Sequence, residues 1–400
     1  MHTKNKFIVI LTLGLLSAIG PFSIDMYLPG FDAIAKEFGT TTNQIAYTLS
    51  SFFIGISVGQ LLYGPLLDKY GRKKPMYFGI TLYIIASIAC AFCTNVESLL
   101  VFRFFQALGG CVGMVASRAM VRDMFDVEES ARIFSLLMLV LGISPIVAPT
   151  LGGYVAHYLG WQYVFYFLAL LGAIIICLVF FALPETKEKD HHYSLMPKNI
   201  LTQFAEVLKN KQFLTYALTG ALTASALYAY IAGSPHVFME IFKVSSKEYG
   251  LIFAVIASGL IIATQLNNVL LNHFRSYQII PKSIIMQCVI GIILLLGFYF
   301  HLFNIYATIA ACCCFLACQG LIFPNASALA IAPFSKNAGS ASALLGCIQM
   351  AFGALSSGLV SYFQTGNALP MAIVMLLCVV FGFIVLSLGQ FSMVKQKKMV

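Results

Sequence analysis

Two ionisable side chains lie inside long apolar runs of the sequence, where a charge is costly. They are Asp25 and Arg103. An ionised side chain at the centre of a membrane helix costs about 2.5–3.5 kcal/mol, so each of the two needs a function or a partner. Counted inward from Gly30 and from Glu97, at 1.5 Å per residue, both lie roughly 8–9 Å below the same boundary. A carboxyl group at this depth can bind and release a proton, and a guanidinium at equal depth can balance its charge.

The residues around this pair also allow a second interpretation. Asp25 stands between Pro21 and Pro29, which bend a helix because each removes a backbone donor. Its shallow position also fits an interfacial carboxylate that reaches the lipid headgroups. Arg103 has Gln106 three residues later, so the two side chains can extend a buried polar network. The sequence leaves both interpretations of Asp25 open.

A compact charged turn at residues 64–74 separates two apolar runs. Asp68 precedes Arg72 by four residues, and Gly71 is free to adopt a positive φ between them. This turn is either a gating element or a positively charged cytoplasmic anchor. The charged stretch around Asp123 either joins it in a network or is a solvated face. The residues predicted to matter in the turn are Gly64, Asp68, Lys69, Gly71, Arg72 and Lys73.

Prolines, glycines and uncharged polar residues elsewhere point to a cavity. One run carries residues that loosen a helix and allow close backbone approach, namely Pro145, Pro149, Gly152 and Gly153. A few polar side chains in apolar surroundings suit a pocket for a mostly apolar ligand. The predicted cavity residues are Tyr27, Gln106, Tyr228, Tyr230, Gln265, Gln319, Asn325 and Gln349. Each of them also fits hydrogen bonding between packed helices.

The composition shows which elements must position these residues. Hydrophobic residues make up 60% of the chain, charged residues 10%, and the mean hydropathy is +0.89. Soluble domains carry about 25% charged residues, so the chain is expected to lie in a membrane. A spanning helix needs about 20 apolar residues. Twelve such runs occur, at 7–28, 44–66, 76–94, 99–120, 134–157, 161–183, 211–232, 250–272, 281–301, 305–326, 340–362 and 368–391.

The distribution of charge and polarity predicts the topology. With the N-terminus in the cytoplasm, most of the 24 Lys and Arg fall on the cytoplasmic side, so both termini are expected there. The net charge of +9 therefore reflects orientation in the membrane and not a nucleic-acid partner. The polar stretch 184–210 predicts three parts: an N-terminal six-helix half at 1–183 on the proton-coupling side, a cytoplasmic linker at 184–210, and a C-terminal six-helix half at 211–400.

Metal and catalytic chemistry find little support in the sequence. The densest cysteine group is Cys312, Cys313, Cys314 and Cys318. Consecutive helical residues point about 100° apart and cannot converge on one ion, so no metal site is predicted. No arrangement typical of hydrolases or metalloproteases occurs. The sequence therefore predicts neither an enzyme nor a bound cofactor.

Together, these motifs resemble the Bcr/CflA drug-resistance branch of the drug:proton antiporters in the major facilitator superfamily. The resemblance rests on the turn at 64–74 and on the segments 23–29, 103–109, 144–153, 231–235, 323–326 and 339–346. It implies that Asp25 binds protons, that Arg103 is its electrostatic partner, and that the turn of Asp68 and Arg72 is a cytoplasmic latch. The latch carboxylate is then expected to meet the start of the eleventh helix, at residues 339–340.

Three positions depart from the wider pattern. Ala107 and Ala148 stand where general antiporter motifs have glycine, and Ser17 stands where one relative has a second acid. The first two departures tie the antiporter interpretation to the narrower branch. The third puts a stoichiometry above one proton in doubt.

The resemblance implies a monomeric secondary transporter of the bacterial inner membrane. Such a protein exports small lipophilic compounds or drugs in exchange for protons, by alternating access. Its partners are the substrate, protons and the lipid bilayer. Because one fold serves many substrates, the alternative is proton-coupled transport of a native metabolite such as a siderophore, an amino acid or a sugar.

Overall fold

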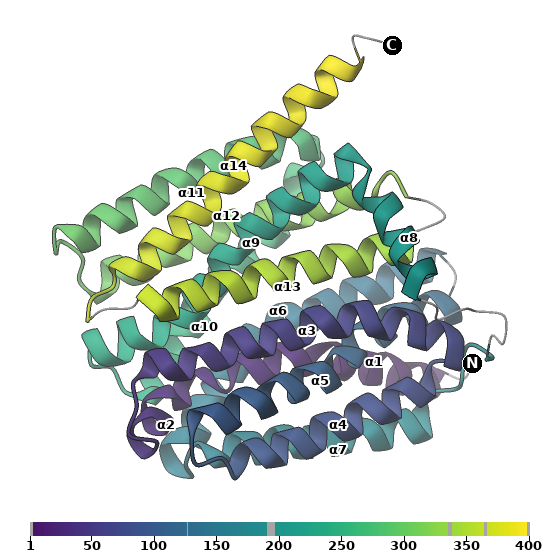
Figure 1. The fold of residues 1–400 in the computed structure, drawn as a ribbon, viewed down its shortest axis with the longest axis horizontal. Coiled ribbons are helices and arrows are strands. Elements are labelled where there is room, and N and C mark those ends of the chain that lie inside the picture. Colours follow the sequence, from purple (N-terminus) through teal and green to yellow (C-terminus); the bar gives the residue numbers. More distant parts are fainter. Residues whose placement is uncertain (1–2, 126, 190–196, 335–337, 364–365, 398–400) are drawn as a thin grey trace. The chain divides into compact units, whose positions relative to one another are not determined.

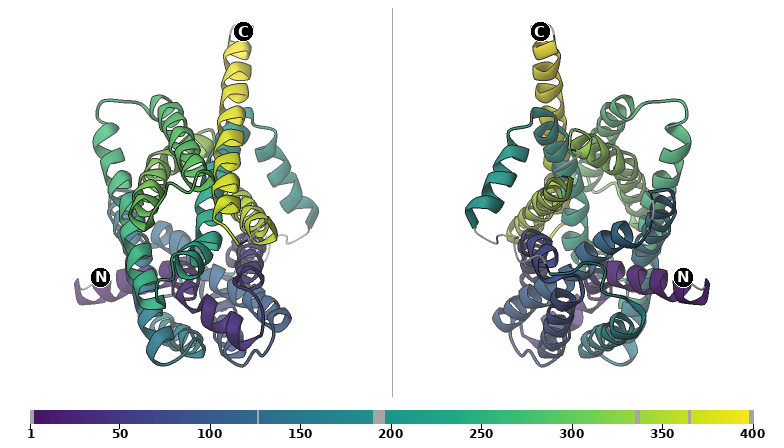
Figure 2. Two further views of the ribbon diagram at one scale, coloured as in Figure 1. Left: turned by 90° about the vertical axis from the view of Figure 1, so that its left-hand side faces the viewer. Right: turned by 90° about the vertical axis from the view of Figure 1, so that its right-hand side faces the viewer.

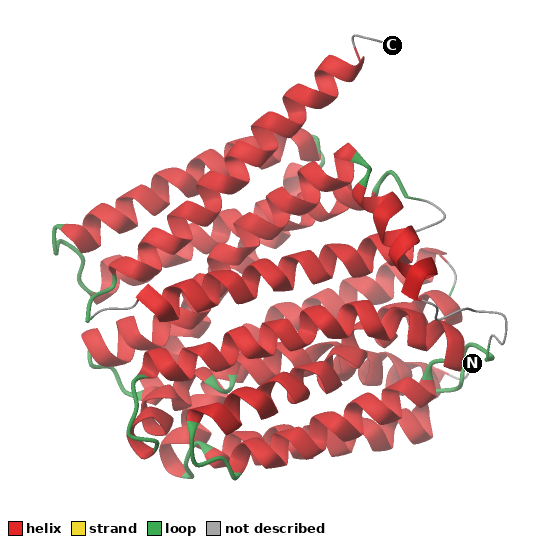
Figure 3. Cartoon of the chain, in the orientation of Figure 1, coloured by secondary structure: helices red, strands yellow, loops and turns green. Residues whose placement is uncertain are grey.

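The computed structural model describes residues 3–125, 127–189, 197–334, 338–363 and 366–397. All regular secondary structure in this part of the chain is helical (Figure 3). The chain divides into two compact units. Unit 1 comprises Met1–Thr41, Ser51–Ile200 and Ser246–Leu251, and unit 2 comprises Thr42–Ser50, Leu201–Ser245 and Ile252–Val400. The predicted division at 184–210 stays a prediction.

The helices follow one another with short connections. The first half of the chain forms α1 (Thr3–Asp25), the 3-10 turn η1 (Leu28–Gly30), α2 (Phe31–Glu37), α3 (Thr42–Tyr70), α4 (Lys73–Ala91), α5 (Val96–Met124), α6 (Val127–Tyr158) and α7 (Gln162–Ala182). The second half forms α8 (Pro197–Leu208), α9 (Lys211–Pro235), the π-helical turn η2 (His236–Ile241), α10 (Ser246–Leu270), α11 (Ser276–Tyr299), α12 (Ile305–Ile331), α13 (Ala338–Phe363) and α14 (Leu369–Lys397).

Each of the twelve predicted runs corresponds to a long helix. Ten stretches of the described chain are long and apolar enough to cross a membrane. The two other long helices are α6, with 32 residues, and α9, with 25 residues. The prediction of an all-α membrane protein with twelve long helices is confirmed.

The first predicted run ends earlier than expected. It was predicted to continue to residue 28, but α1 ends at Asp25. Proline has no backbone N–H, so Pro29 cannot donate the helical hydrogen bond to the carbonyl of Asp25, four residues earlier. The chain turns through η1 and then forms the short helix α2. This turn places Asp25 at a helix end.

Within unit 1, α1 packs against α5, α6 and α7, and α4 packs against α5 and α7. Figure 1 shows α4 and α7 running side by side. Glycines allow the closest approaches. A Cβ atom on Gly109 would lie 2.5 Å from the Tyr83 nitrogen, and one on Gly113 would lie 2.3 Å from the Leu16 carbonyl oxygen. These contacts hold α5 tightly against α4 and α1, around the residues described below.

Within unit 2, α9 is the central helix. It packs against α12, α13 and α14, while α11 packs against α12 and α14. In Figure 2 the last turns of α14 extend beyond the neighbouring helices of this unit. Most of the polar residues predicted in the second half therefore lie on α9 itself or on α12 and α13, which pack against α9, whereas Gln265 lies on α10.

Candidate functional site

Asp25 is the last residue of α1, in unit 1. It is only 5% exposed, and it forms no ion pair with another described residue. Gly152 of α6 lies directly beside the next peptide, because a Cβ atom there would lie 2.2 Å from the Met26 carbonyl oxygen. A buried carboxyl without a charged partner is costly to ionise. The predicted proton binding by Asp25 stays a prediction.

Arg103 of α5 is completely buried in the same unit. Its Nη1 atom donates to the Ser23 carbonyl oxygen at 3.0 Å and to Gln106 Oε1 at 2.6 Å. The last carbonyls of a helix lack helical partners and carry partial negative charge. Ser23 is close to the end of α1, so this helix end helps to balance the guanidinium.

Aromatic rings cover the rest of the guanidinium. Its central carbon lies 4.1 Å from the centre of the Phe52 ring and 4.5 Å from that of Tyr27. Such stacking stabilises a cation by about 2 kcal/mol when water is excluded. The Nε and Nη2 atoms of Arg103 have no hydrogen-bond partner among the described residues. The ion pair between Asp25 and Arg103 that equal depth permits is therefore not formed in this structure.

A chain of hydrogen bonds connects this site to α4. Gln106 Nε2 donates to Ser87 Oγ at 2.8 Å, and Ser87 Oγ donates to the Tyr83 carbonyl oxygen at 2.7 Å. The Tyr83 hydroxyl lies 2.7 Å from Ser23 Oγ, which returns the network to α1. Gln106 thus serves the internal network in this arrangement, and its predicted contact with substrate stays a prediction.

The predicted proline and glycine motif brings α6 close to two other segments of unit 1. Besides the approach of Gly152 to Met26, a Cβ atom on Gly153 would lie 2.7 Å from the Ser246 carbonyl oxygen. A Cβ atom on Gly250 would lie 2.5 Å from the Pro149 carbonyl oxygen. The first turns of α10 therefore pack backbone to backbone on α6. Pro145 lies one turn earlier in α6.

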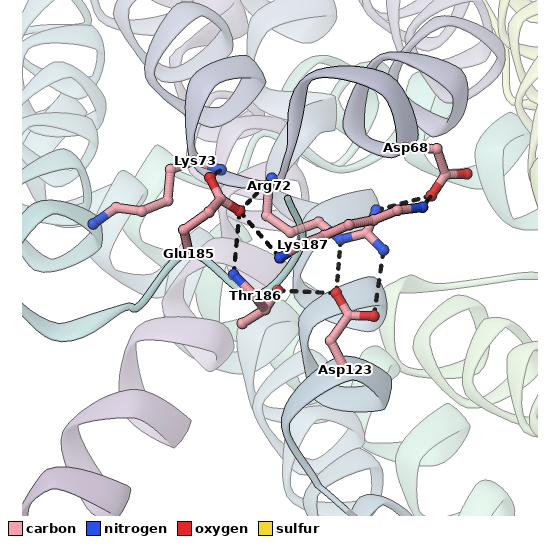
Figure 4. A network of polar contacts seen from close by, with 7 residues as sticks. All are labelled: Asp68, Arg72, Lys73, Asp123, Glu185, Thr186 and Lys187. Atoms are coloured by element: carbon pink, nitrogen blue, oxygen red, sulfur yellow. Dashed lines mark hydrogen bonds and ion pairs between the residues drawn. The ribbon is translucent and has the colours of Figure 1, made fainter. Parts of the chain in front are cut away.

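The charged turn forms an ion network with two other segments of unit 1 (Figure 4). Arg72 Nε donates to Asp123 Oδ2 at 2.7 Å, and Nη2 donates to Asp123 Oδ1 at 3.3 Å. Arg72 Nη1 also donates to Asp68 Oδ1 at 3.1 Å. Lys187 donates to the same Asp68 oxygen at 2.8 Å, and Thr186 Oγ1 donates to Asp123 at 2.9 Å. Of the charged stretch around Asp123, Asp123 itself joins the network.

The electrostatics of the network favour a permanently charged Arg72, which is 6% exposed. Burial lowers the pKa of the guanidinium, but the hydrogen bonds and charges of Asp123 and Asp68 raise this pKa more. A raised pKa in the folded state means that the contribution of Arg72 is lost only as the pH rises through that high value. The Arg72 guanidinium therefore stays charged at physiological pH.

Glu185 caps the start of α4 from a distant segment. Its carboxylate accepts from the Arg72 backbone nitrogen at 2.7 Å and from that of Lys73 at 3.0 Å. An anion at a helix N-terminus satisfies free N–H groups and the helix dipole. Lys73 Nζ donates to the Leu183 carbonyl oxygen at 2.9 Å. Gly71 has φ of 83°, and a Cβ atom there would lie 2.8 Å from the Lys187 carbonyl oxygen.

Two other predicted residues of the turn lie apart from this network. A Cβ atom on Gly64 would meet no atom within 4 Å, so close packing does not require glycine there. Lys69 Nζ lies 5.7 Å from the centre of the Tyr70 ring. Their predicted roles in gating stay predictions.

Three predicted cavity residues of unit 2 lie in contacts between helices. Tyr230 is 1% exposed, and its ring centre lies 5.7 Å from that of Phe253. Tyr228 packs on Gly353, where a Cβ atom would lie 2.6 Å from the Tyr228 ring. With its amide oriented to satisfy both atoms, Gln319 donates to the Thr223 carbonyl oxygen at 3.1 Å and accepts from the Ala224 nitrogen at 3.2 Å. Their predicted role in a cavity stays a prediction.

The other three predicted residues of unit 2 differ in their environments. Asn325 Nδ2 donates to Asn267 Oδ1 at 2.6 Å, and both residues are 2% exposed. Gln265 is exposed, and it accepts from Asn268 at 3.4 Å. Gln349 is 6% exposed, and its Nε2 atom is buried without a hydrogen-bond partner among the described residues. Gln349 therefore has the strongest unmet need for a polar contact among these three.

Comparison with known proteins identifies the family. The family model described as the Major Facilitator Superfamily matches residues 13–357. The chain belongs to the major facilitator superfamily. It is therefore a membrane transporter and not an enzyme, and the long helices described above form the transport domain of a facilitator.

Individual relatives and a solved structure are similar to this facilitator over most of its length. A bicyclomycin resistance protein homolog from Haemophilus influenzae is 31% identical over 377 residues, which cover 94% of each chain. The multidrug resistance protein MdtL from Escherichia coli is 30% identical over 331 residues, which cover 82% of each chain. A crystal structure of a D-xylose–proton symporter has a TM-score of 0.72 at 13% identity, covering 94% of this chain and 97% of that one. This last likeness shows the fold alone.

Sequence reasoning missed several residues of the facilitator's polar networks, among them Glu185, Lys187 and Asn267. Glu185 and Lys187 stand in a stretch that the sequence marks only as a charged linker. Their distance from the charged turn, more than 110 positions along the chain, left no local signal. Asn267 was not singled out, because the apolar pattern of α10 does not show which face is buried.

The ion network gives a first prediction. Asp123→Asn is expected to destabilise the folded transporter by about 1–3 kcal/mol, because Arg72 is buried and loses a charge-assisted bidentate partner. The measurement is thermal unfolding of the purified protein in detergent. Glu188→Gln removes an exposed carboxylate from the same region and is the matched control. Equal unfolding temperatures for both variants would show that the network contributes no stability.

Proposed function

We propose that this transporter exports small lipophilic compounds in exchange for protons. The observation that carries the proposal is the carboxyl group of Asp25, which is buried at the end of α1 and forms no ion pair with any described residue. A group of this kind exists in a charged and a neutral form with different preferences for water. Its protonation therefore favours one arrangement of the surrounding helices over another.

The surroundings of Asp25 support a coupling role. Arg103 donates to the carbonyl of Ser23, two residues before Asp25 in the same helix end. When Asp25 is ionised, it attracts the oppositely charged Arg103, whose Nε and Nη2 atoms have no hydrogen-bond partner among the described residues. Protonation of Asp25 removes that attraction. Proton binding would thus change how α1 and α5 hold each other.

The relatives support export of drugs in particular. The names of the Haemophilus influenzae and Escherichia coli relatives refer to bicyclomycin resistance and multidrug resistance. We infer a broad, mostly apolar substrate class, because the predicted cavity residues of unit 2 are uncharged and offer few directional contacts. The amide nitrogen of Gln349, which is buried and has no hydrogen-bond partner among the described residues, is suited to orient such a compound.

The proposal includes a location. We propose that the transporter lies in the bacterial inner membrane as a monomer. Both termini and the network of Arg72 are then on the cytoplasmic side. The excess of Lys and Arg in the turn at 64–74 supports this orientation. Protease or antibody accessibility of a C-terminal tag in intact and permeabilised cells tests the orientation directly.

The test of the function is transport by the purified protein in liposomes. With an imposed proton gradient, we expect concentrative movement of bicyclomycin or of the lipophilic dye ethidium, and we expect a proton ionophore to stop it. A sugar, an amino acid and a siderophore serve as comparison substrates. Gradient-dependent movement of one of these, without movement of the lipophilic compounds, would replace drug export by transport of a metabolite.

A further inference from the structure

The end of α9 departs from regular helix in a way that creates a polar site. Pro235 has no backbone N–H, so the Ile231 carbonyl loses its helical partner, and Ser234 Oγ donates to it at 3.4 Å. The chain then continues as the π-helical turn η2, in which the Phe242 nitrogen donates to the Val237 carbonyl oxygen at 3.1 Å. Single π-helical turns are rare and are frequently functional.

This turn holds a histidine and a glutamate in direct contact. His236 Nδ1 lies 2.6 Å from Glu240 Oε2. The other carboxylate oxygen of Glu240 accepts a hydrogen bond from the hydroxyl of Thr42, the first residue of α3. Thr42–Ser50 and η2 both belong to unit 2. The pair on η2 therefore fastens the first turn of α3.

The groups around the pair favour the charged form of the Glu240 carboxylate. The hydrogen bond from His236 lowers the pKa of Glu240 more than burial raises it, and Thr42 and Lys243 lower it further. A carboxylate with a lowered pKa keeps its contribution until the pH falls through that low value. Imidazole is the side chain that changes charge between pH 5 and 8. Thr42 of α3, which donates a hydrogen bond to Glu240, carries no charge.

The burial of His236 makes the neutral and the protonated imidazole unequal in free energy. His236 is 6% exposed, and its Nε2 atom is buried without a hydrogen-bond partner among the described residues. Neutral imidazole can leave Nε2 as an empty acceptor. A second proton turns Nε2 into a buried donor without an acceptor, which destabilises the closed arrangement. That destabilisation disappears if the turn opens and Nε2 reaches water.

When the turn η2 opens, one contact of the pair is kept and another is broken. His236 and Glu240 stand four residues apart on one turn, so they stay together when that turn moves, and the carboxylate continues to favour the imidazolium. Thr42 is on a different helix, so its hydrogen bond to Glu240 breaks. We propose that His236 and Glu240 form a second proton-binding site, separate from Asp25, whose occupation releases the first turn of α3 from η2.

The test measures the release of the first turn of α3 from η2 and does not depend on transport. Hydrogen exchange of residues 42–50 and 236–241 is followed in the full-length protein in lipid nanodiscs at pH 5.5 and pH 7.5, after correction for the intrinsic effect of pH. In the unaltered protein we expect exchange of 42–50 to be about tenfold faster at pH 5.5, the factor for one pKa unit of difference between the two arrangements.

Three variants make the test decisive. His236→Gln keeps a donor but cannot titrate, so its exchange should be equal at both pH values. Thr42→Val removes the hydroxyl and should exchange fast at both, while Thr42→Ser keeps it and should behave as the unaltered protein. An unchanged pH response in His236→Gln, or no response in the unaltered protein, would overturn the proposal. Because no substrate is present, these outcomes are independent of whether drugs are exported.

Discussion

Replacing Asp25 by Asn is expected to abolish proton-driven accumulation of substrate. Asn has nearly the same shape as protonated Asp but cannot release a proton. A potential of 100 mV supplies about 2.3 kcal/mol per proton, and a pH difference of one unit supplies about 1.4 kcal/mol. Exchange of one proton for one neutral molecule can therefore sustain a concentration ratio of about 500-fold. In Asp25→Asn this ratio should fall to about one, as measured by substrate distribution in liposomes with an imposed gradient.

The control for this experiment separates coupling from folding. Asp32→Asn also neutralises a carboxylate of the first helices, but Asp32 is partly exposed and pairs with Lys36 in the same helix. It should accumulate substrate as the unaltered protein does. Exchange of labelled for unlabelled substrate without a gradient should persist in Asp25→Asn and show that the binding site is intact. Undiminished accumulation in Asp25→Asn would remove this residue from the mechanism.

The sequence predicted the long helices well because one quantity, the length of an apolar run, decides where they form. A run of about 20 apolar residues both spans a bilayer and forms a helix, so length alone located the twelve long helices. The end of the first helix was placed too late, because its apolar character continues past the residue where Pro29 interrupts hydrogen bonding. The helix α2 has seven residues and contains Asp32 and Lys36, so no apolar run marked it.

Local contacts of the site were predicted better than distant ones. The ion pair of Asp68 with Arg72 and the hydrogen bond of Arg103 with Gln106 follow from spacings of four and three residues. The capping of α4 by Glu185 depends on where α7 ends in space, which no local pattern reveals. Equal depth allowed Asp25 to pair with Arg103, but depth does not fix the direction of a side chain around its helix.

The same limit applies to buried polar residues of the second half. Neighbouring residues on a helix point about 100° apart, so the choice between Asn267 and Asn268 depends on the rotation of α10. The mean hydropathy of a helix contains no information on this rotation. The structure resolves it, because Asn267 meets Asn325 in the interior while Asn268 is exposed.

Gly152→Ala is expected to cause the largest loss of transport outside the charged groups. The added Cβ atom would lie 2.2 Å from the Met26 carbonyl oxygen and 2.7 Å from its carbonyl carbon. These are backbone atoms, which cannot turn aside as a side chain does, so α6 must move away from the peptide that follows Asp25. Overpacking of this kind costs about 1–3 kcal/mol. It should lower the unfolding temperature and reduce gradient-driven transport together.

A matched substitution at the same helix pair isolates this effect. Gly14 lies in α1, and a Cβ atom there would lie 3.4 Å from the nearest atom, a methyl carbon of Val140 in α6. That side chain can adjust, and Ala favours a helix over Gly by about 1 kcal/mol. Gly14→Ala should therefore fold and transport at least as well as the unaltered protein. Equal transport by Gly152→Ala and Gly14→Ala would mean that the close approach of α6 to Met26 does not position Asp25, because the same added methyl group would then have the same effect at both sites.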